Sequence, residues 1–400
     1  MLIFNAMNIL YIHQYFRTPD EGGCVRSYHL AKGLVDAGHS VTMITAHNIK
    51  NGSEKIDGIN VHYLRIPYQN EFGFIRRIIA FLKFVRGSKK TIKSLNRDFD
   101  LAYVMTTPLT TGLIALHLIS AYGVPYYFEV GDLWPEAPIQ MGVIKNRFLQ
   151  NLLYDFEKQC YSQAKTVIAL SPDIKNYIQR VSPNALIKVI PNFSDLEFFD
   201  FHPIKKRFNT KNPLKVCYVG TFGQANHLEY LIDAAKACAD VQLPVHFTLM
   251  GEGKTFENIS QLALGYENIK VLPFSNLEEV KVILEQCDAS YVSFLNIDVL
   301  GTGSPNKFFD GLAAGNMIIV NFGGWINHLV TEKNLGFVYQ PEKLEDFANK
   351  IKEYIEYPQK LLSAQRNSRD LAEQRFSKAL QIRKLIDLVS AKTLTAVIDS

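Results

Sequence analysis

Short apolar runs alternate with amphipathic segments along the whole chain. In the first half, runs with β-branched or aromatic content predict strands at 7–11, 41–45, 61–65, 101–105, 126–130, 166–170 and 188–190. Apolar positions at helical spacing predict helices between several of them, for example over 25–37, 109–121 and 146–162. Strands that alternate with helices in this way predict an α/β fold, in which helices cover both faces of a parallel sheet.

The same rhythm restarts after a polar stretch at 200–212. New strands are predicted at 215–219, 246–250, 269–272, 289–293 and 317–321. Because 400 residues exceed what one hydrophobic core usually holds, we predict two Rossmann-like, doubly wound domains. The first spans 1–200, joined by a C-terminal helix at about 380–400, and the second spans 201–379. Ligands bind beyond the carboxyl ends of parallel strands, so we expect the two domains to face each other across a shared cleft.

Composition excludes several classes of protein. The five cysteines are scattered and the ten histidines lack ligand spacing, which argues against a metal site or a disulfide framework and fits a reducing cytoplasm. A net charge of +4 is too small to indicate a nucleic-acid binder. The apolar N-terminus lacks a basic region and a cleavage site, so we interpret it as a first strand. We also find no apolar run of about 18 residues, the length that a membrane span needs.

One segment, 74–97, carries many basic residues and no acidic ones. Isoleucine, leucine and phenylalanine lie between them, which is typical of a helix that rests on anionic lipid. We therefore predict contact with the inner face of the cell membrane through Arg76, Arg77, Lys83 and Arg86. The alternative is a helix that packs on the core and exposes a solvated basic side.

The segment SPNKFFDGLAAG at 304–315 predicts a helix with an anion site at its start. Ser304 is a good N-cap residue and Pro305 suits the first helical position, so the free N–H groups around Asn306 would face a ligand. Lys307 adds a full charge, and Asp310 lies on the same helix face, where it can accept hydrogen bonds from ribose. The alternative is a capped helix with a surface pair between Lys307 and Asp310.

Glycines follow the first predicted strand of each half. Gly22 and Gly23 precede one helix, and Gly220 and Thr221 begin a similar loop in the second half. Such glycines let the backbone approach a phosphate, although ordinary turns also need them. Neither loop is a GxGxxG or a Walker A sequence, so a nicotinamide cofactor is not indicated. Phe274 follows another strand end, where it can lie against a nucleobase.

The loop FEVGDLWPEAP at 128–138 has the composition of a sugar-binding loop. Glu129, Asp132 and Glu136 can bind hydroxyls, Trp134 can pack on a pyranose, and Asp132 can deprotonate an acceptor. The alternative is a rigid structural corner formed by the tryptophan and the prolines. His13 lies just past the first strand, where it could line the same region.

Together these segments resemble glycosyltransferase family 4, the retaining transferases of the GT-B fold, over nearly the whole chain. The resemblance rests on the Gly22-Gly23 loop, AGHSVTMIT (37–45), IPNFSDLEFF (190–199), YVGTFG (218–223), LMGEGK (249–254), CDASYVSF (287–294) and SPNKFFDGLAAG. The DLWPE and SPNK sequences are similar to a bacterial subgroup that adds amino sugars such as N-acetylfucosamine during surface-polysaccharide synthesis.

The chain also departs from the family pattern. Two glutamates eight positions apart are usual, and Thr302 and Asp310 stand in their places. The usual basic pair after the first strand of the second domain is absent, so Lys307 would carry more of the diphosphate charge. Gly131 stands where the subgroup often has arginine.

The resemblance implies hexosyl transfer from a UDP-sugar to a polyprenyl-diphosphate-linked glycan, with retention of configuration and no metal or other cofactor. The absence of a DxD sequence agrees with the last point. Lys307, the helix start at 304–306 and the Gly220-Thr221 backbone would stabilise the leaving phosphate, with Gly22 and Gly23 closing on it. Asp310 would bind ribose, Phe274 the base and Asp132 the acceptor or donor sugar. Two alternatives remain: a sugar-nucleotide epimerase of the same fold, and a non-catalytic sugar-nucleotide-binding subunit.

Overall fold

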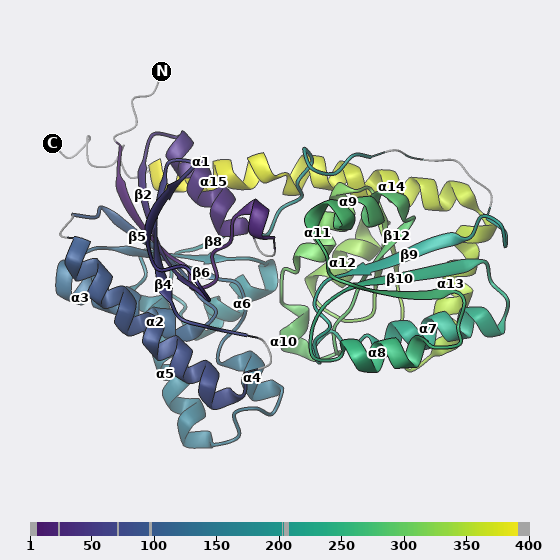
Figure 1. Cartoon of the computed structure of the whole chain (residues 1–400), viewed down its shortest axis with the longest axis horizontal. Coiled ribbons are helices and arrows are strands. Elements are labelled where there is room, and N and C mark those ends of the chain that lie inside the picture. Colours follow the sequence, from purple (N-terminus) through teal and green to yellow (C-terminus); the bar gives the residue numbers. More distant parts are fainter. Residues whose placement is uncertain are drawn as a thin grey trace. The chain divides into compact units, whose positions relative to one another are not determined.

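The computed structural model describes residues 6–22, 25–69, 72–95, 98–201, 203 and 208–390, which form two compact units (Figure 1). The first unit runs to Pro191 and also contains residues 302–304 and the chain from Ala379 onward. The second unit contains Asn192–Gly301 and Pro305–Lys378. Of the segments discussed above, Gly23, Arg97 and residues 391–400 lie outside the described residues.

A sheet with the strand order β3-β4-β2-β1-β5-β6-β7-β8 forms the centre of the first unit. Neighbouring strands are parallel, except that β3 and β4 form an antiparallel hairpin. The strands are β1 (Asn8–Ile12), β2 (Ser40–His47), β3 (Gly52–Ile56), β4 (Ile59–Arg65), β5 (Leu101–Met105), β6 (Tyr126–Val130), β7 (Thr166–Ala169) and β8 (Ile187–Val189).

Helices pack on both faces of this sheet (Figure 1). They are α1 (Arg26–Asp36), α2 (Phe74–Leu95), α3 (Gly112–Tyr122), α4 (Glu136–Gln140), α5 (Arg147–Gln163), α6 (Pro172–Val181) and α15 (Lys378–Ser390). Side chains alternate across a strand, so Ile9 and Tyr11 of β1 share one face, where they pack in a cluster with Leu30 and Leu34 of α1 and Leu385 of α15. The C-terminal helix thereby completes the core of the first unit.

The second unit has a six-stranded parallel sheet in the order β11-β10-β9-β12-β13-β14. Its strands are β9 (Leu214–Val219), β10 (Val245–Gly251), β11 (Ile269–Pro273), β12 (Ala289–Val292), β13 (Met317–Val320) and β14 (Gly336–Val338). Its helices are α7 (Glu229–Asp240), α8 (Phe256–Ala263), α9 (Leu277–Gln286), α10 (Asp298–Gly301), α11 (Asn306–Ala313), α12 (Trp325–Glu332), α13 (Leu344–Glu356) and α14 (Pro358–Leu371).

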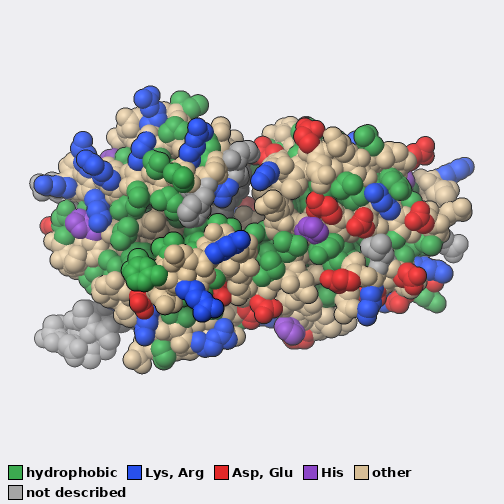
Figure 2. All heavy atoms as spheres, turned by 90° about the horizontal axis from the view of Figure 1, so that it is seen from below, with side chains coloured by type: hydrophobic (Ala, Val, Ile, Leu, Met, Phe, Trp, Pro, Cys, Tyr) green, Lys and Arg blue, Asp and Glu red, His purple; other side chains and the backbone are tan. Residues whose placement is uncertain are grey.

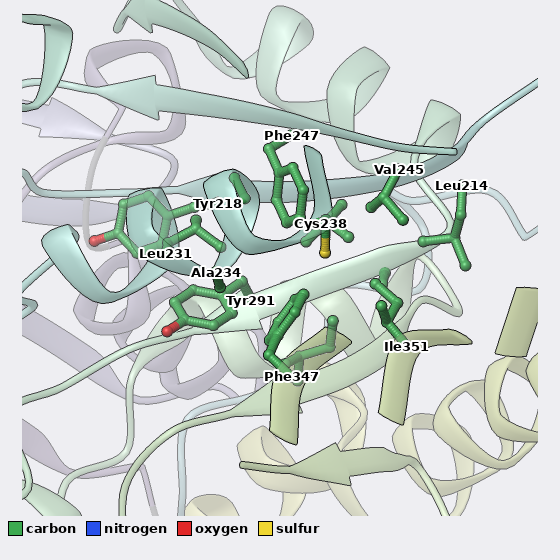
Figure 3. Close-up of a cluster of buried hydrophobic side chains, with 14 of the residues drawn as sticks. Leu214, Tyr218, Leu231, Ala234, Cys238, Val245, Phe247, Tyr291, Phe347 and Ile351 are labelled. Carbon is green, nitrogen blue, oxygen red and sulfur yellow. The ribbon is translucent and has the colours of Figure 1, made fainter. Parts of the chain in front are cut away.

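The largest cluster of the second unit lies between one face of its sheet and the helices α7 and α13 (Figure 3). Alternate residues of β9, among them Leu214 and Tyr218, are buried there against Leu231 of α7 and against Phe347 and Ile351 of α13. The ring of Tyr218 is thus anchored in the core, and the position of its hydroxyl is fixed by packing.

Each predicted strand is present, with ends that differ from the prediction by two residues at most. The α/β fold of two Rossmann-like units is therefore confirmed. Two strands were missed: β3 is an exposed edge strand that carries charges, and β14 has only three residues. Among the described residues, no helix is both long enough and apolar enough to cross a bilayer.

In each sheet the chain order reverses between two neighbouring parallel strands near its centre. In the first unit this reversal lies between β1 and β5, and in the second between β9 and β12. Because the loops that follow these strand pairs run in opposite directions, they leave a crevice at the carboxyl edge, where α/β proteins bind ligands.

Candidate functional site

The ammonium group of Lys307 lies at the reversal point of the second sheet. It donates hydrogen bonds to the hydroxyl of Tyr218, at 2.8 Å, and to Oδ1 of Asn226, at 2.7 Å. It also lies 4.4 Å from the ring centre of Tyr218 and 5.3 Å from that of Phe294. Tyr218 is on β9 and Phe294 follows β12, so the two reversing strands together position this cation.

No carboxylate pairs with Lys307 anywhere in the described part of the chain. The side chain is partly buried, and desolvation lowers its pKa from 10.5 to about 7. An anion placed beside it would restore the charged form, because an opposite charge in a desolvated site is only weakly screened. The alternative of a surface pair with Asp310 is not found in the structure, since no ion pair joins the two side chains.

Asp310 follows one turn later on α11 and is also partly buried. Burial in the first place, and then the charge of Asp195, raise its pKa to about 7. Its carboxyl group has no hydrogen-bond partner among the described residues. A buried carboxyl without a partner is costly, and hydroxyl donors of a ligand would satisfy it.

The start of α11 differs from the prediction. The helix begins at Asn306, and Pro305 occupies the N-cap position with an extended ψ of 133°. Proline has no side-chain acceptor, so no side chain caps the helix. Ser304, which is buried, lies one residue before the N-cap position and does not fill that role. Ser304 groups with the first unit. The N–H groups of Asn306 and Lys307 donate to no acceptor within the described chain, which leaves the positive end of the helix open.

Gly220 keeps the space beside the Lys307 ammonium open. Its φ is +147°, and a Cβ there would lie 3.4 Å from Cε and 3.6 Å from Nζ of Lys307. A Cβ on Gly251 would lie 1.8 Å from the carbonyl oxygen of Gly220, so Gly251 must lack a side chain for the two loops to pass so closely. The carbonyl of Thr221 accepts a bond from the Tyr218 hydroxyl at 2.7 Å.

Phe274 joins the same edge of the sheet. Its N–H donates to the carbonyl of Gly251 at 3.0 Å, and its ring is 37% exposed, as a surface for stacking requires. The structure thus brings Gly220, Thr221 and Lys307 together, with Phe274 linked to them through Gly251.

In the first unit, His13 and Gly22 lie beyond the carboxyl end of β1. His13 is buried, and its Nδ1 lies 2.7 Å from the hydroxyl of Ser27. Desolvation, and then the charge of Arg17, lower the pKa of His13 to about 3, so the ring stays neutral. Gly22, with φ +69°, ends the short helical turn at Pro19–Glu21.

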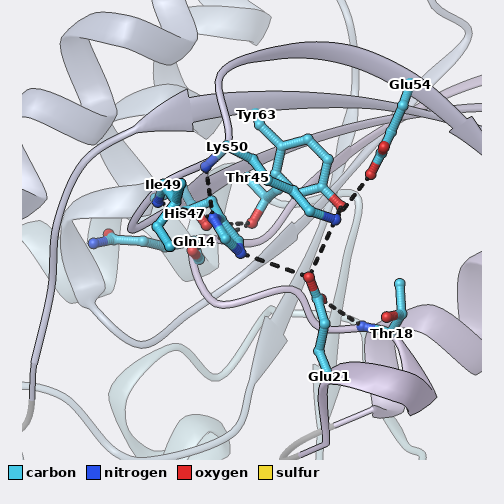
Figure 4. Close-up of polar contacts among 10 residues, drawn as sticks. Gln14, Thr18, Glu21, Thr45, His47, Ile49, Lys50, Glu54 and Tyr63 are labelled. Atoms are coloured by element: carbon cyan, nitrogen blue, oxygen red, sulfur yellow. Dashed lines mark hydrogen bonds and ion pairs between the residues drawn. The ribbon is translucent and has the colours of Figure 1, made fainter.

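Glu21 fastens the loop that precedes Gly22 (Figure 4). Its carboxylate accepts a hydrogen bond from the N–H of Thr18 at 3.1 Å and lies 3.2 Å from Nζ of Lys50 and 3.5 Å from Nε2 of His47. The spacing Thr18-x-x-Glu21 is a capping-box signal, and it is the feature of the sequence that indicates this role.

Glu129, which was predicted to bind a sugar, is engaged inside the core of the first unit. Its fully buried carboxylate receives two hydrogen bonds from Arg26, at 3.1 and 3.0 Å, and another from the hydroxyl of Tyr103. Arg26 in turn donates to the carbonyls of Ile190 and Pro191. All the polar atoms of Glu129 are therefore engaged in holding the core together.

The other residues of the 128–138 loop are arranged differently. Asp132 is exposed and accepts one long hydrogen bond, 3.4 Å from Oγ1 of Thr107. Desolvation nevertheless raises its pKa. Trp134 is partly buried, whereas Glu136 is occupied by the Tyr154 hydroxyl at 2.5 Å and by the Gln140 amide at 2.7 Å. Among the three acids of the loop, Asp132 is the one available to a substrate.

Sequence reasoning missed Tyr218 and Asn226. Tyr218 has the pattern of an ordinary apolar strand position. Asn226 lies in the segment 223–227, which contains no basic pair and so gives no sign of a phosphate site. Their contacts with Lys307 join positions more than 80 residues apart in sequence, and no local pattern reports such contacts.

Family models match both halves of the chain. One, described as "Glycosyl transferase 4-like domain", covers residues 21–192, and another, described as "Glycosyl transferases group 1", covers residues 200–371. No curated protein matches the sequence.

Solved structures share the fold at low identity. A sucrose-phosphate synthase from Thermosynechococcus elongatus is 18% identical over 98% of this chain and 100% of its own, with a TM-score of 0.77. HepE from Anabaena, solved with UDP-glucose, is 18% identical over 96% and 100%, with a TM-score of 0.66. WaaG, described as a glycosyltransferase involved in lipopolysaccharide biosynthesis, is 13% identical over 96% and 99%, with a TM-score of 0.68.

Proposed function

We propose that this chain, which belongs to the glycosyltransferases of the GT-B fold, transfers a hexosyl unit from a UDP-sugar to a hydroxyl of a lipid-linked glycan. The observation that carries the proposal is the partly buried Lys307 ammonium, which has polar neighbours but no carboxylate partner among the described residues. A diphosphate supplies the missing negative charge, and the open start of α11 adds N–H donors beside it.

The donor is assigned to uridine nucleotides by analogy. HepE, which has the same fold, was solved with UDP and with UDP-glucose. In this chain, Asp310 would accept hydrogen bonds from the ribose hydroxyls and Phe274 would stack on the base. Both side chains are available to a ligand, because the carboxyl group of Asp310 has no hydrogen-bond partner among the described residues and the ring of Phe274 is partly exposed.

Departure of the diphosphate is the step that the site assists. Negative charge grows on the β-phosphate as the bond to the anomeric carbon breaks, and Lys307 with the N–H groups of Asn306 and Lys307 would stabilise it. Gly220 leaves room for the phosphate. Asp132 would orient the acceptor hydroxyl or the donor sugar. We further propose retention of configuration and no requirement for a metal.

Helix α2 supports a peripheral contact with an anionic membrane. Ile75, Ile79 and Leu82 are 74%, 47% and 49% exposed, whereas Phe81 and Phe84 on the opposite face are buried in the core. Figure 2 shows hydrophobic side chains interspersed with lysine and arginine on this part of the first unit. An exposed apolar stripe bordered by cations is the pattern of a helix that lies in a membrane interface.

The basic residues assigned to this contact divide into two sets. Arg76, Lys83 and Arg86 are exposed on α2, as the contact requires. Arg77 is only partly exposed, and its Nε donates to the carbonyl of Phe72 at 2.9 Å, so it serves the fold of the preceding loop. A lipid-linked acceptor, presented at the inner face of the membrane, explains why a sugar transferase would carry such a helix.

The finer assignment, to N-acetylated amino sugars of bacterial surface polysaccharides, rests on the resemblance of the DLWPE and SPNK sequences to that subgroup. An epimerase of the same fold needs paired acids and a histidine at the sugar. Asp132, Glu136 and His13 were the candidates for these roles. The structure weakens that alternative, because Glu136 is hydrogen-bonded to Tyr154 and Gln140 and His13 is buried and neutral.

Calorimetric titration with UDP, without metal, tests the proposal. Wild type should bind, and Lys307→Ala should bind much more weakly, while Lys333→Ala, an exposed lysine elsewhere in the second unit, should match wild type. UDP-sugars are then screened with a short-chain lipid-linked acceptor. Binding followed by acceptor-dependent release of UDP identifies a transferase. Interconversion of the donor without acceptor would identify an epimerase, and UDP binding with no turnover a binding subunit.

A further inference from the structure

Arg17 is a partly buried cation without an assigned partner. It lies between β1 and the turn at Pro19–Glu21, and within the described part of the chain its guanidinium forms no ion pair or hydrogen bond. Its charge contributes, after desolvation, to the lowered pKa values of His13 and His47. His13 directly follows β1 and His47 is the last residue of β2. The guanidinium therefore lies near the carboxyl ends of these two strands.

The other cation at this edge is already neutralised. Lys50 lies 3.2 Å from Glu21 and 3.1 Å from Glu54 (Figure 4). Glu21 also faces His47, and the charge of Arg17 is one of those that lower the pKa of Glu21, although no ion pair joins Arg17 to it among the described residues. Arg17 is left with unused donors, and a guanidinium binds the oxygens of a phosphate with matched geometry.

Partly exposed aromatic rings lead from this edge toward α2. The ring centres of Tyr15 and Tyr68 are 5.0 Å apart, and those of Tyr68 and Phe72 are 6.2 Å apart. All three side chains are partly exposed, and we call them the aromatic strip. Phe72 touches the start of α2, since Arg76 lies over its ring at 5.8 Å and Arg77 donates to its carbonyl.

The ring centre of Tyr15 lies 6.4 Å from that of His13, whose pKa the charge of Arg17 lowers, so this end of the strip lies near Arg17. The other end adjoins the start of α2. In sequence, Tyr15 precedes Arg17 by two residues. The exposed Ile75 and Ile79 follow Phe72 by three and seven residues. Apolar rings between a free cation and a membrane-facing stripe match a ligand with an anionic head and a long apolar tail.

We infer that Arg17 binds the diphosphate of a polyprenyl-diphosphate acceptor, and that the aromatic strip covers the first isoprene units on their way to α2. This assignment rests on the proposed function and specifies its acceptor. A phosphopeptide or a nucleic acid would leave both the rings and the apolar side of α2 unused. The inference assigns the diphosphate of the acceptor to Arg17 and that of the donor to Lys307.

Titrations with farnesyl diphosphate, pyrophosphate and farnesol test the site in the full chain. Saturating UDP is present throughout, so that the donor site is filled. Arg17→Ala should weaken binding of farnesyl diphosphate and pyrophosphate about 10- to 100-fold, the loss of a charge-assisted contact. Phe72→Ala should weaken farnesyl diphosphate several-fold and leave pyrophosphate unchanged. Arg180→Ala, an exposed arginine in the last turn of α6, is the matched control.

Three results would overturn the inference: farnesyl diphosphate that binds Arg17→Ala as tightly as wild type, a parallel loss of UDP affinity in that variant, or pyrophosphate that binds as tightly as farnesyl diphosphate. The second would assign Arg17 to the donor, and the third would reduce the site to a simple anion site. Arg17→Gln replaces the alanine variant if the latter does not fold.

Turnover separates this inference from the proposed function. With a lipid-linked acceptor, Arg17→Ala should raise the KM for acceptor and leave the KM for UDP-sugar and the slow hydrolysis of donor by water unchanged. If wild type transfers no sugar at all, the proposed function fails. Arg17-dependent binding of farnesyl diphosphate would still support a lipid-diphosphate site.

Discussion

The ammonium of Lys307 lies 2.8 Å from the hydroxyl of Tyr218, although the two residues are 89 positions apart in sequence. Tyr218 is anchored in the core of the second unit, and its hydroxyl donates onward to the carbonyl of Thr221. Because that proton is engaged, the hydroxyl oxygen accepts from Lys307 and holds the ammonium in place. The core therefore fixes the position of the charge that we assign to the donor diphosphate.

Lys307→Met should weaken UDP binding about 10- to 100-fold, because a charge-assisted contact with the phosphates is lost. Uridine lacks phosphate and should bind the variant as it binds wild type. Calorimetry with the two ligands separates these effects, and Lys333→Met is the control for removal of an exposed lysine. Equal losses for uridine and UDP would show that Lys307 supports the fold of the site and not the diphosphate.

UDP affinity should fall as the pH rises above 7. The pKa of Lys307 is about 7 in the empty site and should increase beside a diphosphate, so binding above pH 7 must take up a proton. The fall approaches tenfold per pH unit between the two pKa values. Titrations in buffers of different ionisation enthalpy measure the proton directly.

Two variants assign this pH dependence. Lys307→Arg stays charged and should flatten the profile. Asp310 also titrates near pH 7, so Asp310→Asn reports its share, and a profile unchanged by both variants would refute the assignment.

Asp310→Asn should make the protein more stable while it binds UDP less well. The pKa of this carboxyl is raised by burial to about 7, so between about pH 4 and 7 the folded protein keeps a proton that the unfolded chain releases. Stability therefore falls as the pH rises through that range, and the variant avoids the fall. We expect a melting temperature at pH 8 that is about 2 °C or more above that of wild type.

The same variant tests the ribose contact. Wild type should prefer UDP over 2′-deoxy-UDP, and Asp310→Asn should lose most of that preference. A retained preference would mean that another group binds the ribose.

Glu129→Ala should destabilise the protein by about 3–5 kcal/mol, because it leaves the buried guanidinium of Arg26 without its carboxylate. Replacing both partners, as in Arg26→Met/Glu129→Met, should recover much of the loss. Urea denaturation measures these differences. A small effect of Glu129→Ala on stability with a large effect on the KM for acceptor would restore Glu129 to the sugar site.

Reversal of charge on α2 should release the protein from anionic vesicles. Arg76→Glu/Lys83→Glu/Arg86→Glu should weaken partitioning at least about 100-fold, given about 1 kcal/mol per basic residue near the surface. A triple reversal elsewhere in the first unit, at Lys175, Arg180 and Lys188, changes the net charge equally and should have a much smaller effect. Equal release by both variants would show that net charge alone holds the protein at the membrane.

Periodicity was sufficient for the sheets because their strands are buried runs bounded by turns. The strands β5 and β6 match the prediction to the residue. The hairpin strand β3 escaped notice because an exposed edge strand lacks the apolar pattern that periodicity detects. Local rules also placed the start of α11 one residue early, since they take account of Pro305 but cannot foresee its extended ψ.

Candidate chemistry was harder to judge, because a carboxylate in a sequence carries no record of its partner. Glu129 and Asp132 lie three residues apart in one loop segment and were assigned the same task. Only the folded structure shows that Arg26, 103 positions away in sequence, donates to Glu129, whereas Asp132 accepts only one long hydrogen bond.

The sequence by itself determined the α/β order of the chain, the family resemblance, and the placing of Lys307 and Asp310 on one helix face, because these depend on spacing along a regular backbone. The tertiary structure decided which charges are neutralised. Lys307 and Arg17 form no ion pair in the described chain, whereas Lys50 does. Charge pairing depends on distances between segments remote in sequence, and these exist only once the sheets have assembled.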